Sequence, residues 1–123
     1  MILYLQQFIY KKLDKKFITY QVRGIYYQVP PNSYFPYIYI GEFNSKNRSV
    51  IGQQISMINF KITIYLRDKS LKPMLDLSRG IKNILNINGE DKVASIRCVE
   101  ENISLQNDGI THQINMKFKA IVS

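Results

Sequence analysis

Apolar residues recur along this chain with two different periods, and each period predicts a type of element. Near the N-terminus the apolar positions are three or four residues apart, at Ile2, Leu5, Phe8, Ile9 and Leu13. That spacing places their side chains on one stripe of a helix. We therefore predict an amphipathic helix over residues 2–13.

A strict alternation of apolar and polar residues occupies the middle of the chain. The apolar positions are Ile58, Phe60, Ile62, Ile64 and Leu66. Because successive side chains of a strand point to opposite faces, this pattern predicts a long strand over Ile55–Leu66 with one buried face.

A second helix is predicted over Leu71–Leu85. Ser70 precedes it as an N-cap, and Pro73 falls in the first turn, where its missing N–H is tolerated. The predicted inward stripe consists of Leu71, Met74, Leu75, Ser78, Ile81 and Leu85, widened by Leu77 and Ile84. The Asn- and Gly-containing segment 86–89 ends the helix.

The last third of the chain predicts a β-hairpin. Its strands are Lys92–Leu105 and Ile110–Val122, and the Asn-Asp-Gly sequence at 107–109 favours a tight turn between them. The apolar phase of the return strand contains Ile110, His112, Ile114, Met116, Phe118, Ala120 and Val122. A regular period of two over this length indicates one buried face.

The first strand of that hairpin changes phase along its length. Its apolar positions are Ala94, Ile96, Cys98, Ile103 and Leu105. The first three are even-numbered and the last two are odd-numbered. A β-bulge near Glu100 and Glu101 explains such a shift, and we predict one there.

The segment before the long strand is rich in β-branched and aromatic residues. Phe17–Val29 predicts one or two short strands around Gly24, and Pro30-Pro31 interrupts the pairing that follows. Tyr37–Glu42 predicts another short strand. Phe43–Gln54 is polar, and we predict either an exposed loop or the tip of a long, flexible hairpin.

Together these elements predict an α+β fold. Antiparallel pairing of the strands, with the two helices packed on one face of the sheet, is the economical arrangement. It gives a two-layer structure with a mainly antiparallel sheet. The length of 123 residues fits one hydrophobic core, so we expect a single domain over residues 1–123.

The composition is basic, yet it is weak evidence for nucleic-acid binding. The formal net charge is +8, and Lys outnumbers Arg by 12 to 5. The chain also contains 19 Ile and 10 Asn residues. The codons for Lys, Ile and Asn are AT-rich, so a low-GC genome raises the charge without selection for phosphate contacts.

The sequence predicts no membrane segment and no secretion signal. It has no run of 18 apolar residues, and its N-terminus lacks a basic flank before an apolar stretch. The single cysteine, Cys98, excludes an intrachain disulfide and favours a reducing compartment.

Residues that could carry out catalysis are few. His112 is the one histidine, and both it and Cys98 are in phase with apolar positions, which is typical of packed residues. A nucleophile–base pair of these two across the hairpin is the weaker alternative. Glu100 and Glu101 are adjacent, so a regular strand points them to opposite faces. Because phosphate loops, nucleophile elbows and zinc motifs are also missing, we expect no enzyme, catalytic residue, metal or cofactor.

Two neighbouring motifs resemble a known family. Gly24-Ile25-Tyr26-Tyr27-Gln28-Val29-Pro30-Pro31 is followed by Phe35-Pro36-Tyr37-Ile38-Tyr39-Ile40-Gly41-Glu42. These motifs, and the order of the predicted elements, resemble the tail-completion family of tailed phages. In that family a strand ending in Val-Pro leads to a Phe-Pro-Tyr strand and a polar loop. The resemblance covers essentially the whole chain.

The resemblance implies a structural tail terminator, also called a head–tail joining or minor tail protein. Such proteins form a ring on the end of the tail tube, stop its polymerisation and join it to the head. The implied partners are further copies in a sixfold ring, the tail tube protein and a head-completion or connector protein. Phages, prophages and gene transfer agents carry them, so the expected location is the cytoplasm during assembly and then the particle tail.

The candidate interface residues come from three segments. Tyr and Arg are enriched at protein interfaces, and exposed loops commonly carry contacts. The candidates are Tyr34, Phe35, Tyr37 and Tyr39, then Lys46 and Arg48 at the predicted loop, and Gln113, Asn115 and Lys117 on the polar edge of the terminal hairpin. Because like charges repel at low salt, the isolated chain is expected to be monomeric when dilute.

The alternative function is that of a small basic nucleic-acid-binding domain. Its phosphate contacts would come from Lys11, Lys12, Lys15, Lys16, Lys46 and Arg48. The tyrosines near Arg23 imitate a stacking platform, but the Lys/Arg-Gly-aromatic pattern of an RNA-recognition sheet is missing. We therefore expect no specific nucleic-acid partner and no membrane partner.

Overall fold

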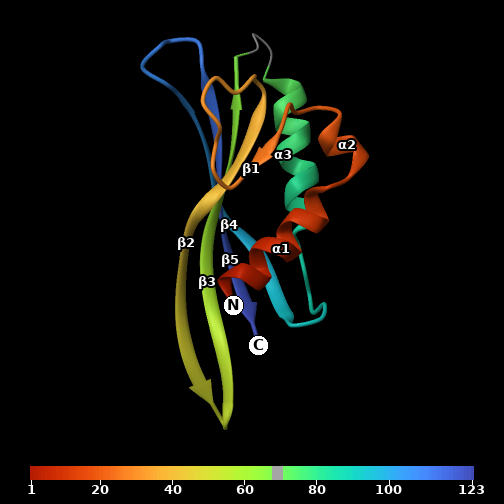
Figure 1. Cartoon of the computed structure of the whole chain (residues 1–123), viewed down its shortest axis with the longest axis vertical. Coiled ribbons are helices and arrows are strands. Elements are labelled where there is room, and N and C mark those ends of the chain that lie inside the picture. Colours follow the sequence, from red (N-terminus) through yellow and green to blue (C-terminus); the bar gives the residue numbers. More distant parts are fainter. Residues whose placement is uncertain (68–70) are drawn as a thin grey trace.

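The computed structural model describes residues 1–67 and 71–123. In chain order the elements are α1 (Ile2–Leu13), α2 (Lys16–Thr19), β1 (Ile25–Tyr26), β2 (Tyr37–Val50), β3 (Gln53–Leu66), α3 (Lys72–Ile84), β4 (Val93–Leu105) and β5 (His112–Val122). The strands form a sheet in the order β1-β2-β3-β5-β4, in which β1 and β2 are parallel and the other neighbours antiparallel. Helices α1 and α3 lie on one face of the sheet (Figure 1). The predicted α+β class is confirmed.

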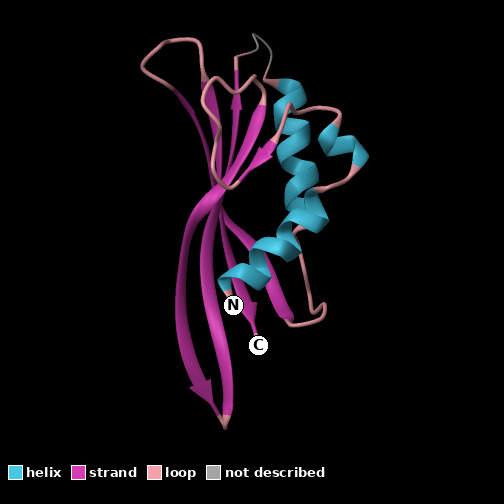
Figure 2. Cartoon of the chain, viewed as in Figure 1, coloured by secondary structure: helices cyan, strands magenta, loops and turns pink. Residues whose placement is uncertain are grey.

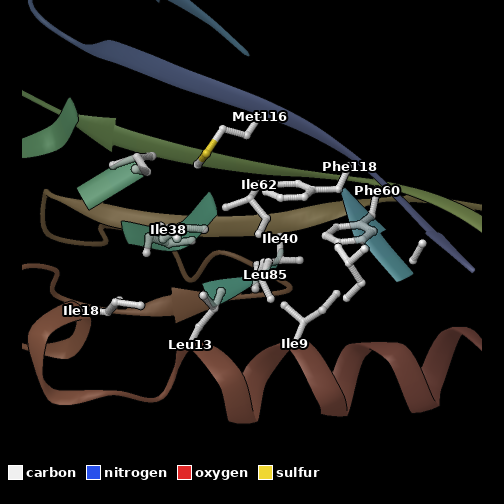
Figure 3. Close-up of a cluster of buried hydrophobic side chains, with 14 of the residues drawn as sticks. Ile9, Leu13, Ile18, Ile38, Ile40, Phe60, Ile62, Leu85, Met116 and Phe118 are labelled. Atoms are coloured by element: carbon white, nitrogen blue, oxygen red, sulfur yellow. The ribbon is translucent and has the colours of Figure 1, made fainter. Parts of the chain in front are cut away.

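The core lies between these helices and the sheet, and it uses the two predicted stripes. The buried apolar residues of α1 and β3 are Leu5, Phe8, Ile9, Leu13, Ile58, Phe60, Ile62, Ile64 and Leu66. Figure 3 shows Ile9 and Leu13 directed from α1 toward the sheet. The rings of Phe60 on β3 and Phe118 on β5 are stacked, with centroids 5.1 Å apart. The periodicity therefore predicted both buried faces.

The inward stripe of α3 differs from the prediction at one position. Its buried residues are Met74, Leu77, Ser78 and Ile81, whereas Leu75 is 36% exposed. The stripe is rotated toward Leu77, so the assignment of Leu75 to the core was wrong. The predicted cap, Ser70, lies outside the described residues; the N-cap is Leu71, and Pro73 is in the first turn.

The segment after α1 contains a short helix and a short strand. Ile25–Tyr26 is one of the short strands predicted around Gly24, whereas the short helix Lys16–Thr19 was not predicted. The reason is tertiary packing: Ile18 is fully buried, and a helical turn places it in the core despite its β-branched side chain. The short strand pairs with β2 at Ile38 and Tyr39.

The terminal hairpin is confirmed, and so is its bulge. The pairing of β4 with β5 passes from Cys98–Phe118 to Glu100–Lys117, which leaves Val99 as the additional residue. A second shift lies between Val93 and Ser95. This second bulge turns Ala94 to solvent and buries Val93, so the predicted inward position of Ala94 was wrong. Ile110 is also exposed, because it precedes β5 in the turn region.

The polar segment Phe43–Gln54 is not a loop. Strand β2 continues to Val50, β3 begins at Gln53, and Ile51-Gly52 forms the turn with φ values of 47° and 75°. Positive φ at both positions is the geometry of a two-residue hairpin turn. The hairpin alternative is thus confirmed and the loop alternative was wrong. Figures 1 and 2 show this hairpin extending beyond the rest of the sheet.

We call residues 44–56 the arm. A bulge at the start of the arm shifts the pairing between Gly41 and Asn44, and Glu42 there has a φ of 57°. Strand β5 pairs with β3 only from Ser56 onward, so residues 48–50 and 53–55 pair with each other alone. The arm tip therefore depends on one ladder of backbone hydrogen bonds.

Candidate interface surfaces

Aromatic side chains form a row on the sheet face opposite α1 and α3, which we call the outer face. The ring centroids of Tyr26 and Tyr37 are 6.0 Å apart, and those of Tyr37 and Tyr65 are 5.0 Å apart. Phe35 adds a ring 5.2 Å from Tyr37. Burial raises the pKa of the Tyr37 and Tyr65 hydroxyls, so both stay neutral. The row offers rigid apolar area with uncharged polar tips, which suits a protein contact.

Arg67 ends this aromatic row. Its guanidinium carbon lies 4.2 Å from the centroid of the Phe35 ring, and its Nε donates to Thr111 Oγ1 at 2.9 Å. Its Nη2 is 3.5 Å from Asp108 Oδ2. The Asp108 carboxylate also accepts the backbone N–H groups of Ile110 and Thr111. Hydrogen bonds, above all from the Thr111 hydroxyl, lower the pKa of Asp108 to about 2.

The sequence offered only a partial clue to this cluster. An Asp in an Asn-Asp-Gly turn commonly accepts backbone N–H groups two or three residues ahead. Nothing in the local pattern indicated that Arg67, at the end of a different strand, would reach the same carboxylate.

The four aromatic interface candidates occupy three different environments. Tyr34 is 79% exposed and extends into solvent. Phe35 and Tyr37 belong to the half-buried row. Tyr39 packs over Gly41, whose lack of a Cβ leaves room for its ring. Tyr34, Phe35 and Tyr37 lie at or just before the start of β2, at one end of the sheet.

The candidates on the terminal hairpin are not at an edge. Gln113, Asn115 and Lys117 belong to β5, which lies between β3 and β4, so the predicted polar edge was wrong. The reason is that β5, returning from β4, also pairs with β3 on its other side. All three alternate with the buried positions and lie on the outer face.

Asn115 is an internal residue of this face. It is 7% exposed, its Oδ1 accepts a hydrogen bond from Thr63 Oγ1 at 3.1 Å, and its Nδ2 donates to Asn102 Oδ1 at 3.0 Å. These two hydrogen bonds connect side chains of β3, β5 and β4. Lys117, by contrast, is exposed and forms an ion pair with Glu100 at 3.0 Å.

Cations gather where the arm leaves the sheet. Lys46 and Arg48 are exposed, and with Arg97 and Lys119 they line a hollow of about 360 Å³ on the outer face. Among the described residues that line this hollow there is no Asp or Glu. Arg97 is held in place by bonds that its Nη1 donates to Ile87 O at 2.7 Å and to other groups of that segment. The hollow is therefore electropositive.

The other predicted cations are elsewhere. Lys11, Lys12, Lys15 and Lys16 lie at the end of α1 and the start of α2, on the helix side of the sheet. Lys12 Nζ is 2.6 Å from Glu90 Oε2, so its charge is compensated. The six predicted phosphate contacts therefore do not form one continuous surface.

Two strand edges are open. β1 covers β2 only at Ile38 and Tyr39, so the β2 edge of the arm has no partner strand among the described residues. β4 is the last strand at the opposite edge of the sheet. Ile87 bridges to Ile96 and covers the beginning of β4, whereas residues 100–105 have no such bridge in the described part of the chain. The sequence pattern indicated neither edge, because it does not show the strand order.

The alternative of a Cys–His pair does not fit the geometry. Cys98 lies opposite Phe118, whereas His112 lies opposite Leu105 and Leu66. The Cys98 thiol donates to Glu100 O at 3.5 Å, and burial raises its pKa. A thiol with a raised pKa is a poor nucleophile. His112 Nδ1 is buried and has no hydrogen-bond partner among the described residues.

The described residues contain no cluster of three or more His, Cys, Asp or Glu side chains that could hold a metal ion. Within the same residues, none of the helices combines the length and apolarity needed to cross a bilayer.

Comparison with known proteins gave matches to a family model and to solved structures. A family model described as tail completion protein gp17 matches residues 15–123. Among solved structures, a chain from a structure titled "Virion of native gene transfer agent (GTA) particle" has a similar fold. The TM-score is 0.77 at 14% sequence identity, and the match covers 93% of this chain and 90% of that one. Comparison with curated protein sequences gave no match.

Proposed function

Because this chain belongs to the tail completion protein gp17 family, and is thus a structural protein of phage-like tails, we propose that it is a tail terminator. The resemblance of the sequence motifs to that family is confirmed. In this proposal the protein forms a ring on the end of the tail tube, stops tube polymerisation and joins the tube to the head. The observation that carries the proposal is the family match over residues 15–123.

Several features of the molecule support a structural role. The arm, the aromatic row and the two open strand edges are surfaces that an isolated subunit leaves uncovered. A ring needs a heterologous contact, in which one patch of each copy binds a different patch of the next copy. We propose that the whole chain, residues 1–123, acts as one domain and that it has no enzymatic activity, no metal and no cofactor.

We assign the candidate interface residues to different contacts. Tyr34, with Phe35, Tyr37 and Tyr39 beside it, is proposed to face the tube protein or a head-completion protein. Lys46 and Arg48 of the arm are proposed to face the neighbouring copy. Gln113 and Lys117 remain candidates on the outer face, whereas the hydrogen bonds of Asn115 assign it to the sheet itself.

The proposed ring is a hexamer, and the isolated chain is proposed to be a monomer when dilute. A net charge of +8 on each copy opposes closure when salt does not screen it. The proposed partners are further copies, the tail tube protein and a head-completion or connector protein. Assembly is proposed to occur in the cytoplasm, before the protein resides in the particle tail.

The test is electron microscopy of the protein mixed with growing tubes of its cognate tail tube protein. Tubes should stop growing and acquire a ring of density at one end. The matched control adds the Ile62→Asp variant, which we expect not to fold, under the same conditions. Tubes that continue to lengthen, with no added density at either end, would defeat the proposal.

The cationic hollow is the observation that favours the second candidate, nucleic-acid binding. Its four cations without a lining carboxylate resemble a phosphate-binding surface. A salt series decides between the two functions: phosphate contacts by Lys46, Arg48, Arg97 and Lys119 would make duplex binding fall steeply with salt. A tail terminator should bind duplex weakly at every salt concentration.

A further inference from the structure

The two open edges of the sheet contain side chains of opposite charge. The β2 edge of the arm, residues 44–50, contains Lys46 and Arg48 and no carboxylate. The open part of β4, residues 100–105, contains Glu100 and Glu101 and no cation; within the same copy Glu100 pairs with Lys117 at 3.0 Å and Glu101 with Lys82 at 3.2 Å. A long unpaired edge is a template for pairing with another strand, and charge complementarity selects the partner.

The pairing inside the sheet determines which backbone groups β4 offers. Gln106 N–H donates to Thr111 O, so the backbone of Gln106 faces β5. Backbone groups alternate between the two sides of a strand. The N–H and C=O groups of Glu101, Ile103 and Leu105 therefore face away from β5, toward the open edge.

The same reasoning applies to the arm. Val50 and Gln53 flank its two-residue turn and are register partners, so the backbone of Val50 faces β3. No register shift occurs between Asn44 and Val50. Alternation then turns the backbone N–H and C=O groups of Ser45 and Asn47 toward the open edge.

We propose that the arm of one copy pairs antiparallel with residues 100–105 of β4 in the next copy, with Arg48 opposite Glu100 and Lys46 opposite Asn102. This pairing rests on the proposed function, because it supplies the contact that closes the ring. The four side chains then share the outer face of one continuous sheet, and the Arg48 guanidinium meets the Glu100 carboxylate.

This register also allows the backbone groups of the two edges to form hydrogen bonds with each other. It places Asn47 opposite Glu101 and Ser45 opposite Ile103, which are the residues whose backbone groups are free on each edge. The pairing also covers part of an exposed apolar surface, since Ile103 is 44% exposed in the single copy. A register one residue away would match outward-facing backbone groups with inward-facing ones.

The direction of the strands agrees with a second copy as the occupant. Three successive antiparallel pairings separate β2 from β4, so these strands run in opposite directions within one copy. A copy related by rotation about an axis tilted from the strand direction, as in a closed sheet, therefore presents its β2 antiparallel to β4. The two edges are different surfaces, so the contact is heterologous and repeats from copy to copy.

The pairing also requires a stagger between copies. Within one copy, Asn44 pairs with Asn59, Asn59 with Lys119 and Lys119 with Arg97, so Asn44 and Arg97 lie at the same height in the sheet. In the proposed contact, Asn44 instead lies opposite Ser104 of the next copy. Successive copies are thus displaced along the strands. Displacement of this kind accompanies the tilt of strands in closed sheets.

Disulfide trapping tests the register directly. In a Cys98→Ala background, Asn44→Cys and Ser104→Cys are combined in one chain; both positions lie on the outer face as a predicted non-hydrogen-bonded pair. Their Cα atoms would be about 4.5 Å apart, which a disulfide can bridge. Mild oxidation should give a ladder of covalent oligomers. The register control combines Lys46→Cys with Ser104→Cys and should give almost no ladder, since these positions would be diagonal neighbours.

Charge exchange tests the contact without cysteines. Arg48→Glu and Glu100→Arg should each weaken self-association by about tenfold in sedimentation, and the double variant should recover it. Arg79→Glu, on the exposed face of α3, changes the net charge by the same amount as Arg48→Glu. It should not weaken self-association, and Glu100→Arg should not restore association in its presence. The recovery separates a specific pair from a general effect of charge.

The outcomes separate this inference from the proposed function. Capped tubes without cross-linked oligomers, and without recovery in the charge-exchanged variant, would overturn the strand pairing and leave the tail-terminator function standing. Tubes that continue to grow would overturn the function. Cross-linked ladders at the Asn44–Ser104 pair, in the presence or absence of tubes, establish the pairing.

Discussion

The guanidinium of Arg67 lies 3.5 Å from the carboxylate of Asp108, and this ion pair joins the end of β3 to the turn between β4 and β5. The same carboxylate accepts two backbone N–H groups and the Thr111 hydroxyl, and these bonds lower its pKa from 3.8 to about 2. The turn at the end of the sheet is thus held by the ionised form of Asp108.

A depressed pKa in the folded state makes stability depend on pH in the acid range. The contribution of Asp108 is complete above its unfolded pKa of 3.8 and is lost as the pH falls toward the folded value of about 2. Asp108→Asn should lower the free energy of unfolding at neutral pH and reduce the decline between about pH 4 and pH 2. Urea unfolding across this pH range measures both effects.

The control for this prediction is Asp76→Asn on the exposed side of α3. Its stability curve should run parallel to that of the unchanged chain. An Asp108→Asn variant whose acid decline equals that of the unchanged chain would contradict the role given to the carboxylate.

Ile62 tests the assignment of the core face of β3. Its side chain is fully buried between the sheet and the helices, so Ile62→Ala should cost about 2–5 kcal/mol of unfolding free energy. Ile62→Asp buries an unpaired charge and should abolish soluble folding. The exposed neighbour Asn59 is the control, because Asn59→Ala should change stability by no more than about 0.5 kcal/mol. Thermal unfolding with unchanged midpoint in Ile62→Asp would show the face to be misassigned.

Cys98 and His112 are predicted to be structural residues. Burial raises the pKa of the Cys98 thiol, so alkylation at neutral pH should be slow compared with a free thiol. The double variant with Cys98→Ala and His112→Asn should be modestly less stable and should still cap tubes. Calorimetry and the tube assay measure these two properties. A well-folded double variant that fails to cap tubes would reveal a functional site at these positions.

The arm is predicted to be the least protected part of the long hairpin in the isolated chain. Ile51 at its tip is 99% exposed, and residues 48–50 pair only with residues 53–55. Few buried contacts favour local opening, so amide exchange there should be faster than over residues 58–66. Ring assembly should slow it. Equal protection of both segments in the free chain would be evidence against this prediction.

Elements that bury one face could be predicted from the sequence because burial imposes a period. The stripe from Leu5 to Leu13 and the alternation from Ile58 to Leu66 both belong to the observed core, and Ile2 packs against it partly buried. Even the bulge at Val99 left a trace, since an additional residue reverses the phase of a strand. Local signals of this kind need no knowledge of the partner element.

The arm left no such trace. Residues 44–49 are exposed, so the arm shows no hydrophobic period. Backbone pairing keeps its strands extended, with one hydrogen bond from Ser56 Oγ to Asn47 Oδ1 across them. The helical turn at Ile18 could not be predicted because its packing in the core overrides the strand preference of a β-branched residue.

The sequence by itself determined the fold class, the two core stripes, the terminal hairpin and, through its motifs, the family. Only the tertiary structure decided the strand order, and with it the two open edges and the place of Gln113 and Lys117 inside the sheet. The physical reason is that alternation shows which side of a strand faces the core. It does not show which strand lies beside it, because that choice depends on contacts between residues far apart in the chain.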